Sequence, residues 1–198
     1  MRIVVSEFMS LDGVVQAPGG PKEDTDGGFA HGGWSMPYFD MEVMGSEIDR
    51  AMQSTQAMMF GRRTWQVSAA AWPQQSGDPF ADRLNALPKY VVSGTLTEQD
   101  LSAWQDSRLV RPGELRETVE RLRAQEGGDL QIYGSASLVR TLLSEGLVDE
   151  YRLMIEPVLL GGGKRAFPED GRLRKLKLVS CREAKTGVLI CVYHPAED

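Results

Sequence analysis

The amino-acid sequence predicts an α/β fold with a mixed, mainly parallel central sheet, flanking helices and a C-terminal antiparallel β-hairpin. Two observations lead to this expectation. Strand-like runs alternate with helix-like segments over most of the chain, and strands without helices follow at the end. Strands separated by helices pair in parallel, because each crossover returns the chain to the same edge. The expected strands are residues 2–8, 56–60, 89–93, 130–133, 150–160, 175–184 and 188–194.

Each element has a local reason in the sequence. The first strand opens with the β-branched run Ile3-Val4-Val5, which suits a buried strand. The helices are predicted from apolar side chains at helical spacing, and two of them end at glycines, Gly127 and Gly146. The last two strands flank Lys185-Thr186-Gly187, which is typical of a hairpin turn. The expected helices are residues 39–55, 114–125 and 138–145, with another beginning after Gly61.

A long glycine- and proline-rich segment, residues 16–37, lies between the first strand and the first helix. A loop of this length inside a compact domain is uncommon and is usually functional or disordered. Its aromatic residues, such as Phe29 and Trp34, give it apolar surface with which to dock. We therefore expect a lid or a pocket wall.

The composition is that of an ordinary globular protein. The chain has 198 residues, of which 41% are hydrophobic and 25% charged, with a formal net charge of −6. The charge disfavours a nucleic-acid partner, and no apolar run approaches the roughly 18 residues that span a bilayer. We expect one cytoplasmic domain over residues 1–198, with no membrane partner and no metal. Cys181 and Cys191 are expected to be buried thiols of the core.

Three predicted strands end in a glycine or small-residue turn beside a helix start. These turns are Gly61-Arg62-Arg63-Thr64, Ser93-Gly94 and Gly134-Ser135-Ala136-Ser137. Ligands of open α/β sheets bind beyond the carboxyl ends of the strands, where helix N-termini favour phosphate. Two arginines at a helix start also favour a nearby anion. A single such turn is more often a plain βα connection, but together they predict a site for a phosphorylated dinucleotide.

The chain resembles the dihydrofolate-reductase superfamily, and especially the C-terminal reductase domain of the riboflavin-biosynthesis deaminase-reductase. The resemblance runs through nearly the whole chain in order. Its most specific part is Leu147-Val148-Asp149-Glu150 followed by Pro157-Val158-Leu159-Leu160-Gly161-Gly162. The other matching segments are Ser10-Leu11-Asp12-Gly13, Gly61-Arg62-Arg63-Thr64-Trp65, Tyr90-Val91-Val92-Ser93 and Gly134-Ser135-Ala136-Ser137-Leu138.

This resemblance implies the cofactor NADPH and direct hydride transfer from its nicotinamide. Arg62, Arg63 and Thr64 would hold the adenosine 2′-phosphate, with Ser93 nearby. Phe8 and Val15 would lie along the nicotinamide. The pyrophosphate would be cradled by residues 134–137. The implied cofactor-binding residues are Phe8, Val15, Gly61, Arg62, Arg63, Thr64, Ser93, Gly94, Gly134, Ser135, Ala136, Ser137 and Leu138.

The residues that would contact the substrate follow the family pattern less closely than those that would bind the cofactor. Asp12 is the candidate catalytic acid, although Asp12-Gly13 is equally a turn former. Dihydrofolate reductases carry an acid on the first helix, where Asp40 or Glu42 falls here. The riboflavin-pathway reductases carry an acid where this chain has Tyr133. Further substrate candidates are Trp34 and Phe39, which could instead pin the loop, and Glu156, which could instead pair with Arg152.

These observations predict an NADPH-dependent reductase of a small planar heterocycle, pteridine-like or aminopyrimidine-like. The alternative is a non-catalytic nucleotide-binding or sensor protein on the same fold. A homodimer is expected, because relatives pair through edge strands and the terminal hairpin exposes such an edge.

Overall fold

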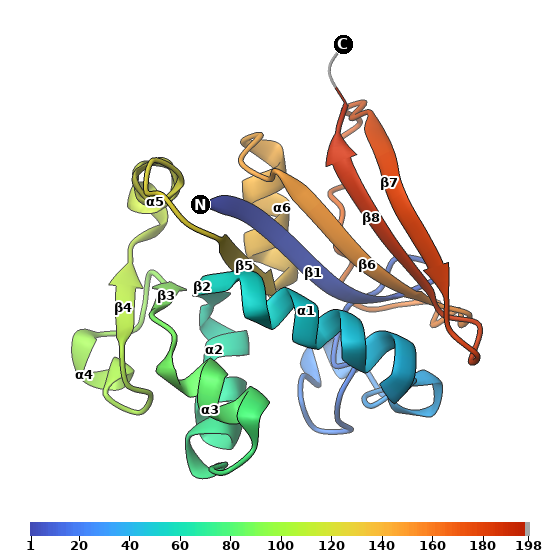
Figure 1. Cartoon of the computed structure of the whole chain (residues 1–198), viewed down its shortest axis with the longest axis horizontal. Coiled ribbons are helices and arrows are strands. Elements are labelled where there is room, and N and C mark those ends of the chain that lie inside the picture. The colour runs from blue at the N-terminus through green and yellow to red at the C-terminus, as the bar shows by residue number, and fades with distance from the viewer. Residues whose placement is uncertain (197–198) are drawn as a thin grey trace.

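A single eight-stranded sheet, in the order β4-β3-β2-β5-β1-β6-β8-β7, runs through the molecule (Figure 1). The computed structural model describes residues 1–196. Strands β1 to β6 pair in parallel, β8 pairs antiparallel with β6, and β7 pairs antiparallel with β8. The mainly parallel sheet and the terminal hairpin are thus confirmed. The strands are β1 (Arg2–Ser10), β2 (Thr55–Gly61), β3 (Lys89–Val92), β4 (Ser107–Val110), β5 (Asp129–Tyr133), β6 (Glu150–Glu156), β7 (Leu176–Glu183) and β8 (Leu189–Pro195).

The helices lie on both faces of this sheet, with α1 crossing the front and α6 lying behind in Figure 1. They are α1 (Ser46–Ser54), α2 (Arg62–Ala71), α3 (Pro79–Ala86), α4 (Glu98–Leu101), α5 (Leu115–Arg123) and α6 (Ala136–Ser144). A π-helical segment, η3 (Met41–Gly45), leads into α1, so the predicted helix 39–55 is present with an irregular first turn. Four short 3-10 turns are η1 (Asp26–Gly28), η2 (Met36–Tyr38), η4 (Trp72–Gln74) and η5 (Pro112–Glu114).

The alternation of side chains along the central strands separates the cores of the two faces. In β2, Ala57 and Met59 pack in the cluster that contains the buried residues of α5 and α6. Met58 and Phe60 point the other way and pack with residues of α2 and α3. Successive side chains of a strand point to opposite faces, so a strand buried on both sides is apolar throughout.

Three elements were not predicted from the sequence: α3, α4 and β4. The signals for the first two were present, because Asp78 caps α3 with Pro79 at its start, and Thr97 with Asp100 forms a capping box at α4. The strand predicted over 150–160 ends at Glu156 instead, since Pro157 lacks the N–H that a continuing ladder needs.

The terminal hairpin corrects the expectation for the cysteines. Cys191 is buried, but Cys181 is exposed because β7 is the outer strand and all eight of its residues are exposed. In residues 1–196 no helix is long and apolar enough to cross a bilayer.

Candidate active site

The carboxyl ends of β3, β2 and β5 lie side by side at one edge of the sheet. Gly61 pairs with Val92, and Met59 pairs with Ile132, so these strands end at the same level. The turns that follow them begin with Arg62, Ser93 and Gly134. The structure therefore brings the three predicted turns together at one edge.

Ser135 joins two of these turns directly. Its hydroxyl donates a 2.7 Å hydrogen bond to Thr64 Oγ1 and accepts one of 2.9 Å from the N–H of Gly61. Gly134, with φ of 60°, and Ser135, with φ of 64°, both adopt left-handed backbone, which for Ser135 is strained. The starts of α2 and α6 are held together as one unit.

The predicted phosphate ligands have different surroundings. Arg62 is exposed and has one long contact, 3.5 Å to Gln66 Oε1. Ser93 is buried, and its hydroxyl accepts hydrogen bonds from the N–H groups of Thr95 and Leu96. Arg111, which the sequence analysis missed, donates to the carbonyl of Ser93 at 3.1 Å. Two exposed arginines thus lie at the same edge.

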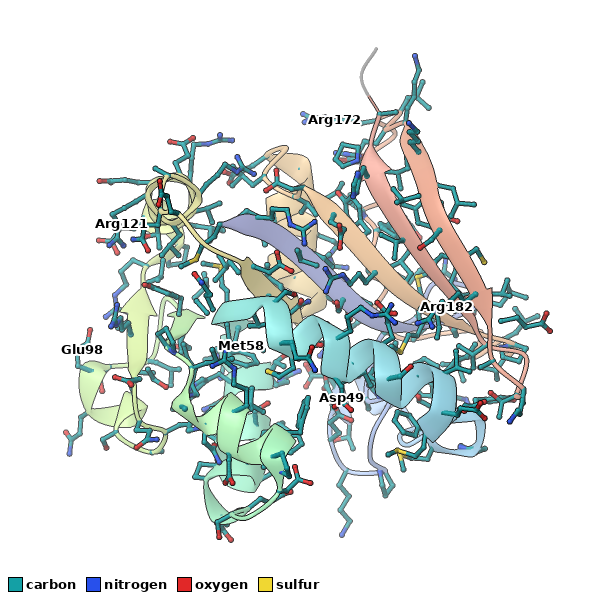
Figure 2. The ribbon with its side chains drawn as sticks, in the orientation of Figure 1. Asp49, Met58, Glu98, Arg121, Arg172 and Arg182 are labelled. Atoms are coloured by element: carbon teal, nitrogen blue, oxygen red, sulfur yellow. The ribbon has the colours of Figure 1, made fainter. Side chains whose placement is uncertain are left out.

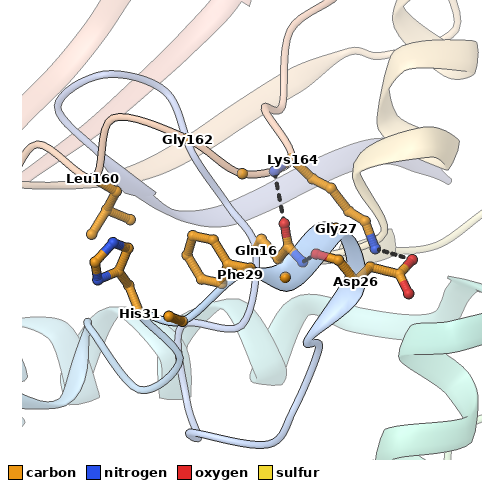
Figure 3. A pocket seen from close by; sticks show the side chains of 11 residues that line it. Gln16, Asp26, Gly27, Phe29, His31, Leu160, Gly162 and Lys164 are labelled. Atoms are coloured by element: carbon orange, nitrogen blue, oxygen red, sulfur yellow. Dashed lines mark hydrogen bonds and ion pairs between the residues drawn. The ribbon is translucent and has the colours of Figure 1, made fainter.

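Arg63 is bound to the long loop, residues 16–37, which we call the lid. Its guanidinium pairs with Asp24, at 3.1 Å, and with Asp26. Lys164, beyond β6, pairs with Asp24 at 2.5 Å and with Asp26 at 3.0 Å, the second of these pairs being drawn in Figure 3. This cluster of Asp24, Asp26, Arg63 and Lys164, the lid cluster, ties the lid to α2 and to the loop after β6.

Two residues that were predicted to bind substrate, Trp34 and Glu156, hold the lid in place. Trp34 is buried, and its indole N–H donates to the carbonyl of Gln16 at 2.7 Å. This hydrogen bond connects the two ends of the lid. Ser35 donates a 2.5 Å hydrogen bond to Glu156, a carboxyl that is 0% exposed at the end of β6. Burial raises the pKa of Glu156 to about 7. The predicted alternative, a pair between Glu156 and Arg152, is wrong because Arg152 binds Glu150 and Asp129 instead.

Asp12, the predicted catalytic acid, is held by three hydrogen bonds. It accepts from the hydroxyl of Ser10 at 2.6 Å and from the N–H groups of Leu160 and Gly161. The Ser10 hydroxyl, with these N–H groups, lowers the pKa of Asp12 to about 2. The carboxylate is therefore ionised at neutral pH and organises the turn between β1 and the loop after β6.

A narrow cavity lies between α1 and the sheet. It encloses only about 20 Å³ of free space. Its apolar wall includes Phe8, whose ring lies 6.5 Å from that of Phe39. The polar residues that line it are Ser6, Glu7, Glu47, Tyr133 and Arg152. Two of the predicted residues, Phe8 and Tyr133, thus meet here.

Glu47 is the acid that α1 presents to this cavity. It is paired with Arg50 at 2.9 Å and with Arg182, which reaches across from β7 (Figure 2). Asp40 and Glu42, the acids predicted for this place, are elsewhere. Asp40 caps the segment before α1, accepting from the N–H groups of Glu42 and Val43, and Glu42 pairs with Lys185.

Most of the chain matches a known family. A profile of the RibD C-terminal domain family matches residues 2–190. The chain belongs to the RibD C-terminal domain family. Protein YyaP of Bacillus subtilis (strain 168), described as uncharacterized, is 30% identical over 200 residues, covering 98% of this chain and 94% of YyaP.

Solved structures place this RibD C-terminal domain in a common fold. A putative riboflavin biosynthesis protein from Shewanella sp. PV-4 superposes with a TM-score of 0.77, at 21% identity over 100% of both chains. Dihydrofolate reductase from Enterococcus faecalis, complexed with NADP(H), superposes with a TM-score of 0.63, at 11% identity over 99% of this chain and 97% of that one. At such identities the likeness shows the fold, and the expected dihydrofolate-reductase-like fold is confirmed.

The remaining predicted residues of this RibD C-terminal domain differ in burial. Val15 is 6% exposed in the core, and Ala136 and Leu138 are buried in the first turn of α6. Gly94 and Ser137 are exposed at the sheet edge. A larger cavity of about 520 Å³, between the lid and residues 160–164, is lined by none of the predicted site residues (Figure 3).

Two acids of the narrow cavity, Glu7 and Glu47, were missed, although the sequence carries a signal for each. Glu47 has helical spacing with Met44 and Ala51, which marks it as an acid on the buried side of α1. Glu7 stands two residues from both Val5 and Met9, so period two places its side chain on the buried face of β1 that packs with α5 and α6, and only the strand itself borders the cavity.

Proposed function

We propose that this protein is an NADPH-dependent reductase that transfers a hydride to a small planar heterocycle, pteridine-like or aminopyrimidine-like. The observation that carries the proposal is the junction of Ser135 with Thr64 and Gly61. It fixes two helix N-termini at one sheet edge, next to a cavity with an acid and an arginine. The argument has a cofactor part and a substrate part.

The backbone at the junction fits a pyrophosphate. Helices α2 and α6 both begin there, and their free N–H groups favour phosphate oxygens. A Cβ on Gly134 would lie 3.3 Å from Thr64, and one on Gly61 would lie 3.2 Å from Ser135, so a side chain at either position would crowd this approach. Arg62 and Arg111 are exposed near Ser93, where they would hold a 2′-phosphate.

The bound cofactor would supply the hydride, and the chain would supply position and shelter. In this proposal Phe8 contacts the nicotinamide side, and the lid covers the reacting pair and excludes water. Glu47 would bind the N–H edge of the heterocycle, taking the place of the acid that dihydrofolate reductases carry on this helix. Arg152 and Tyr133 would bind its oxygen substituents.

Cofactor preference tests the first part. Titration of the protein with NADPH and with NADH, followed by tryptophan fluorescence, should show tighter binding of NADPH. Replacement of Arg62 by alanine should weaken NADPH by about 1.5–3 kcal/mol, roughly tenfold to a hundredfold, and leave NADH nearly unchanged. Arg121→Ala, an exposed arginine of α5 far from the junction, is the matched control (Figure 2). Equal affinity for the two cofactors would remove the phosphate argument.

Turnover tests the second part. A screen of oxidised pterins and aminopyrimidine derivatives, with NADPH absorbance as the readout, should find steady consumption with at least one compound. Glu47→Gln should abolish or strongly reduce it. A protein that binds NADPH tightly but consumes none with any compound is instead a nucleotide-binding or sensor protein.

The proposal includes a cytoplasmic location, one functional domain and a homodimer. The exposed outer strand β7 supports the homodimer. The backbone donors and acceptors of β7 that do not pair with β8 face outward, and Leu176, Leu178 and Val179 are 39%, 50% and 51% exposed. A long exposed apolar edge strand favours pairing with another strand, and a two-fold axis would pair β7 with its copy.

A further inference from the structure

Three neighbouring strands place hydrogen-bond donors on the sheet side of the narrow cavity. Ser6 on β1 pairs in register with Tyr133 of β5 and with Arg152 of β6, and all three residues line the cavity. Val5, the residue before Ser6, packs with α5 and α6 on the opposite face. Because side chains alternate along a strand, the Ser6 side chain points toward α1.

These donors are only partly used in the part of the chain that the structure describes. Arg152 binds Glu150 through Nε and Asp129 through Nη2, whereas its Nη1 atom has no hydrogen-bond partner among residues 1–196. Within the same residues, the hydroxyl groups of Ser6 and Tyr133 donate to no protein atom. The carboxylate on the opposite wall, that of Glu47, is bound through Oε2 to two arginines. The sheet side of the cavity therefore offers donors that lack an acceptor.

Gln131, on β5, determines how the Ser6 hydroxyl is oriented. Its Nε2 atom donates to Ser6 Oγ at 2.7 Å and to the carbonyl of Val4 at 3.3 Å. A carbonyl oxygen cannot donate, so the amide must present its nitrogen to Val4 and thus also to Ser6. The Ser6 oxygen accepts from Gln131, and its own proton is left for an acceptor in the cavity.

The other end of the Gln131 amide is unpaired. Gln131 is 0% exposed, and among residues 1–196 its Oε1 atom is buried without a hydrogen-bond partner. An unpaired buried polar atom lowers stability, and an apolar side chain at this place would avoid the loss. The neighbours along β5, Leu130 and Ile132, are apolar. A glutamine at this position is thus accounted for by the hydrogen bond that it gives to Ser6.

We propose that Ser6 determines substrate specificity by donating a hydrogen bond to an oxo oxygen of the heterocycle, with Gln131 as its positioning residue. The inference rests on the function proposed above and concerns the sheet side of the same site. An oxo group accepts the Ser6 proton, whereas an amino group in its place would leave that proton unpaired. The present free space of about 20 Å³ holds about one water molecule, so the ring binds as α1 moves outward, while the strands keep Ser6 in place.

The test compares two pteridine probes of similar size. Lumazine carries two oxo groups, and 2,4-diaminopteridine carries two amino groups at the same ring positions. Fluorescence titration in the presence of NADP⁺ gives a Kd for each probe, and the wild type should bind lumazine more tightly. Ser6→Ala should lower this preference about tenfold, because the hydrogen bond to the oxo group is lost, and NADPH affinity should stay within twofold.

Gln131→Met tests the positioning role. Methionine has a similar length but no amide, so Ser6 keeps its hydroxyl and loses the group that orients it. The preference for lumazine should fall, and adding Ser6→Ala should lower it no further than Ser6→Ala alone, because both changes act on one hydrogen bond. A glutamine that only supports the fold would change the free energy of unfolding in urea and leave the preference unaltered.

The control is Thr118→Val, which removes a buried hydroxyl from α5, on the other face of the sheet. It should leave the preference unchanged. An undiminished preference for lumazine in Ser6→Ala would overturn the Ser6 role and leave the reductase function standing. A wild type that binds neither probe, or binds 2,4-diaminopteridine at least as tightly, would also overturn the role. If no heterocycle supports NADPH consumption either, the reductase function falls with it.

Discussion

The hydroxyl of Ser135 donates a hydrogen bond to the hydroxyl of Thr64 across 71 positions of sequence, and this contact joins the two halves of the proposed cofactor site. The same Ser135 oxygen accepts from the N–H of Gly61, so one side chain fixes the start of α2 against the turn that opens α6. The left-handed backbone of Ser135 costs roughly 1–2 kcal/mol for a residue with a Cβ. Strain of this kind is typical of ligand sites.

Replacement of Ser135 by alanine should therefore lower the free energy of unfolding by about 1–3 kcal/mol, because two hydrogen bonds are lost while the strain remains. Replacement by glycine should destabilise less, because glycine adopts the left-handed backbone without strain. Both variants should weaken NADPH. Urea unfolding and fluorescence titration measure the two effects.

Ser144→Ala, at the exposed end of α6, is the control for Ser135 and should change neither quantity. If Ser135→Ala is as stable as the wild type and binds NADPH equally well, the junction is not what organises this edge.

The lid cluster gives a second prediction. Asp24 and Asp26 form ion pairs with the guanidinium of Arg63, so a cofactor phosphate that binds Arg63 must compete with these two carboxylates. Asp24→Asn combined with Asp26→Asn should loosen residues 16–37, seen as faster amide hydrogen exchange there. It should also raise NADPH affinity by about threefold to tenfold, because exposed ion pairs contribute roughly 0.2–1 kcal/mol each.

Asp49→Asn, an exposed acid of α1, removes a negative charge without touching the lid and is the control (Figure 2). If the Asp24–Asp26 double variant binds NADPH more weakly than the wild type, the two carboxylates assist binding by closing the lid, and the competition argument is wrong.

Glu156 should make the stability depend on pH. Its pKa is about 7 in the folded protein and 4.5 for an unperturbed glutamate, so the folded state keeps a proton that the unfolded state releases. The contribution of Glu156 is fully present below pH 4.5 and is lost as the pH rises through 7. We therefore compare the free energy of unfolding of Glu156→Gln with that of the wild type. The variant's value minus the wild-type value should rise by about 2–3 kcal/mol as the pH rises from 4.5 to 8.

Urea unfolding of both proteins at several pH values measures this difference, with Glu98→Gln as the control. A difference that stays constant with pH would show that Glu156 is ionised in the folded state and that its contact with Ser35 is an ordinary charged hydrogen bond.

Much of the fold was predictable because it depends on local patterns. The apolar run at Ile3 and the glycines at Gly127 and Gly146 mark strands and helix ends without knowledge of tertiary contacts. Strand β4 was missed because Ser107–Val110 is short and only partly buried, so that its pairing with β3 comes from tertiary contact.

The site was predictable only where it follows from turns. The carboxyl ends of parallel strands lie at one edge, and β3, β2 and β5 are adjacent in the sheet, so Gly61, Ser93 and Gly134 are neighbours; the sequence predicted the turns but not this strand order. The partners of Asp12, Glu156 and Arg63 lie in distant loops, and no local pattern predicts them. The register of the first helix after the lid was open, and Asp40 was therefore considered in place of Glu47.

The paired cysteines give a redox prediction. Cys181 and Cys191 lie directly opposite each other on β7 and β8, with their sulfur atoms 3.4 Å apart. Oxidised glutathione should convert them to a disulfide within one chain, releasing two molecules of reduced glutathione, because opposite residues of a β pair lie within disulfide range. Mass spectrometry should show the loss of two hydrogen atoms, and Cys181→Ser should prevent it.

The same treatment also tests the alternative pairing. Non-reducing electrophoresis of the oxidised protein should show single chains. Linked chains would mean that the exposed Cys181 reacts first with a second molecule, and the pairing across the hairpin would not be favoured.

The outer strand β7 supports the last prediction. If two copies pair through β7 about a two-fold axis, each residue of the strand is present twice in the interface, so one substitution introduces two changes. Leu178 is 50% exposed, so the single chain should tolerate a lysine there. In the dimer, the two copies would bring two positively charged lysines into one interface, where they would be buried or would repel each other.

Sedimentation should show dimers for the wild type and single chains for Leu178→Lys. Val67→Lys, on α2 at the other end of the sheet, should remain a dimer, because Val67 is a comparably exposed apolar residue outside the hairpin. Single chains in the wild type would show that the exposed leucines of β7 do not drive association, and dimers in Leu178→Lys would move the interface to another surface.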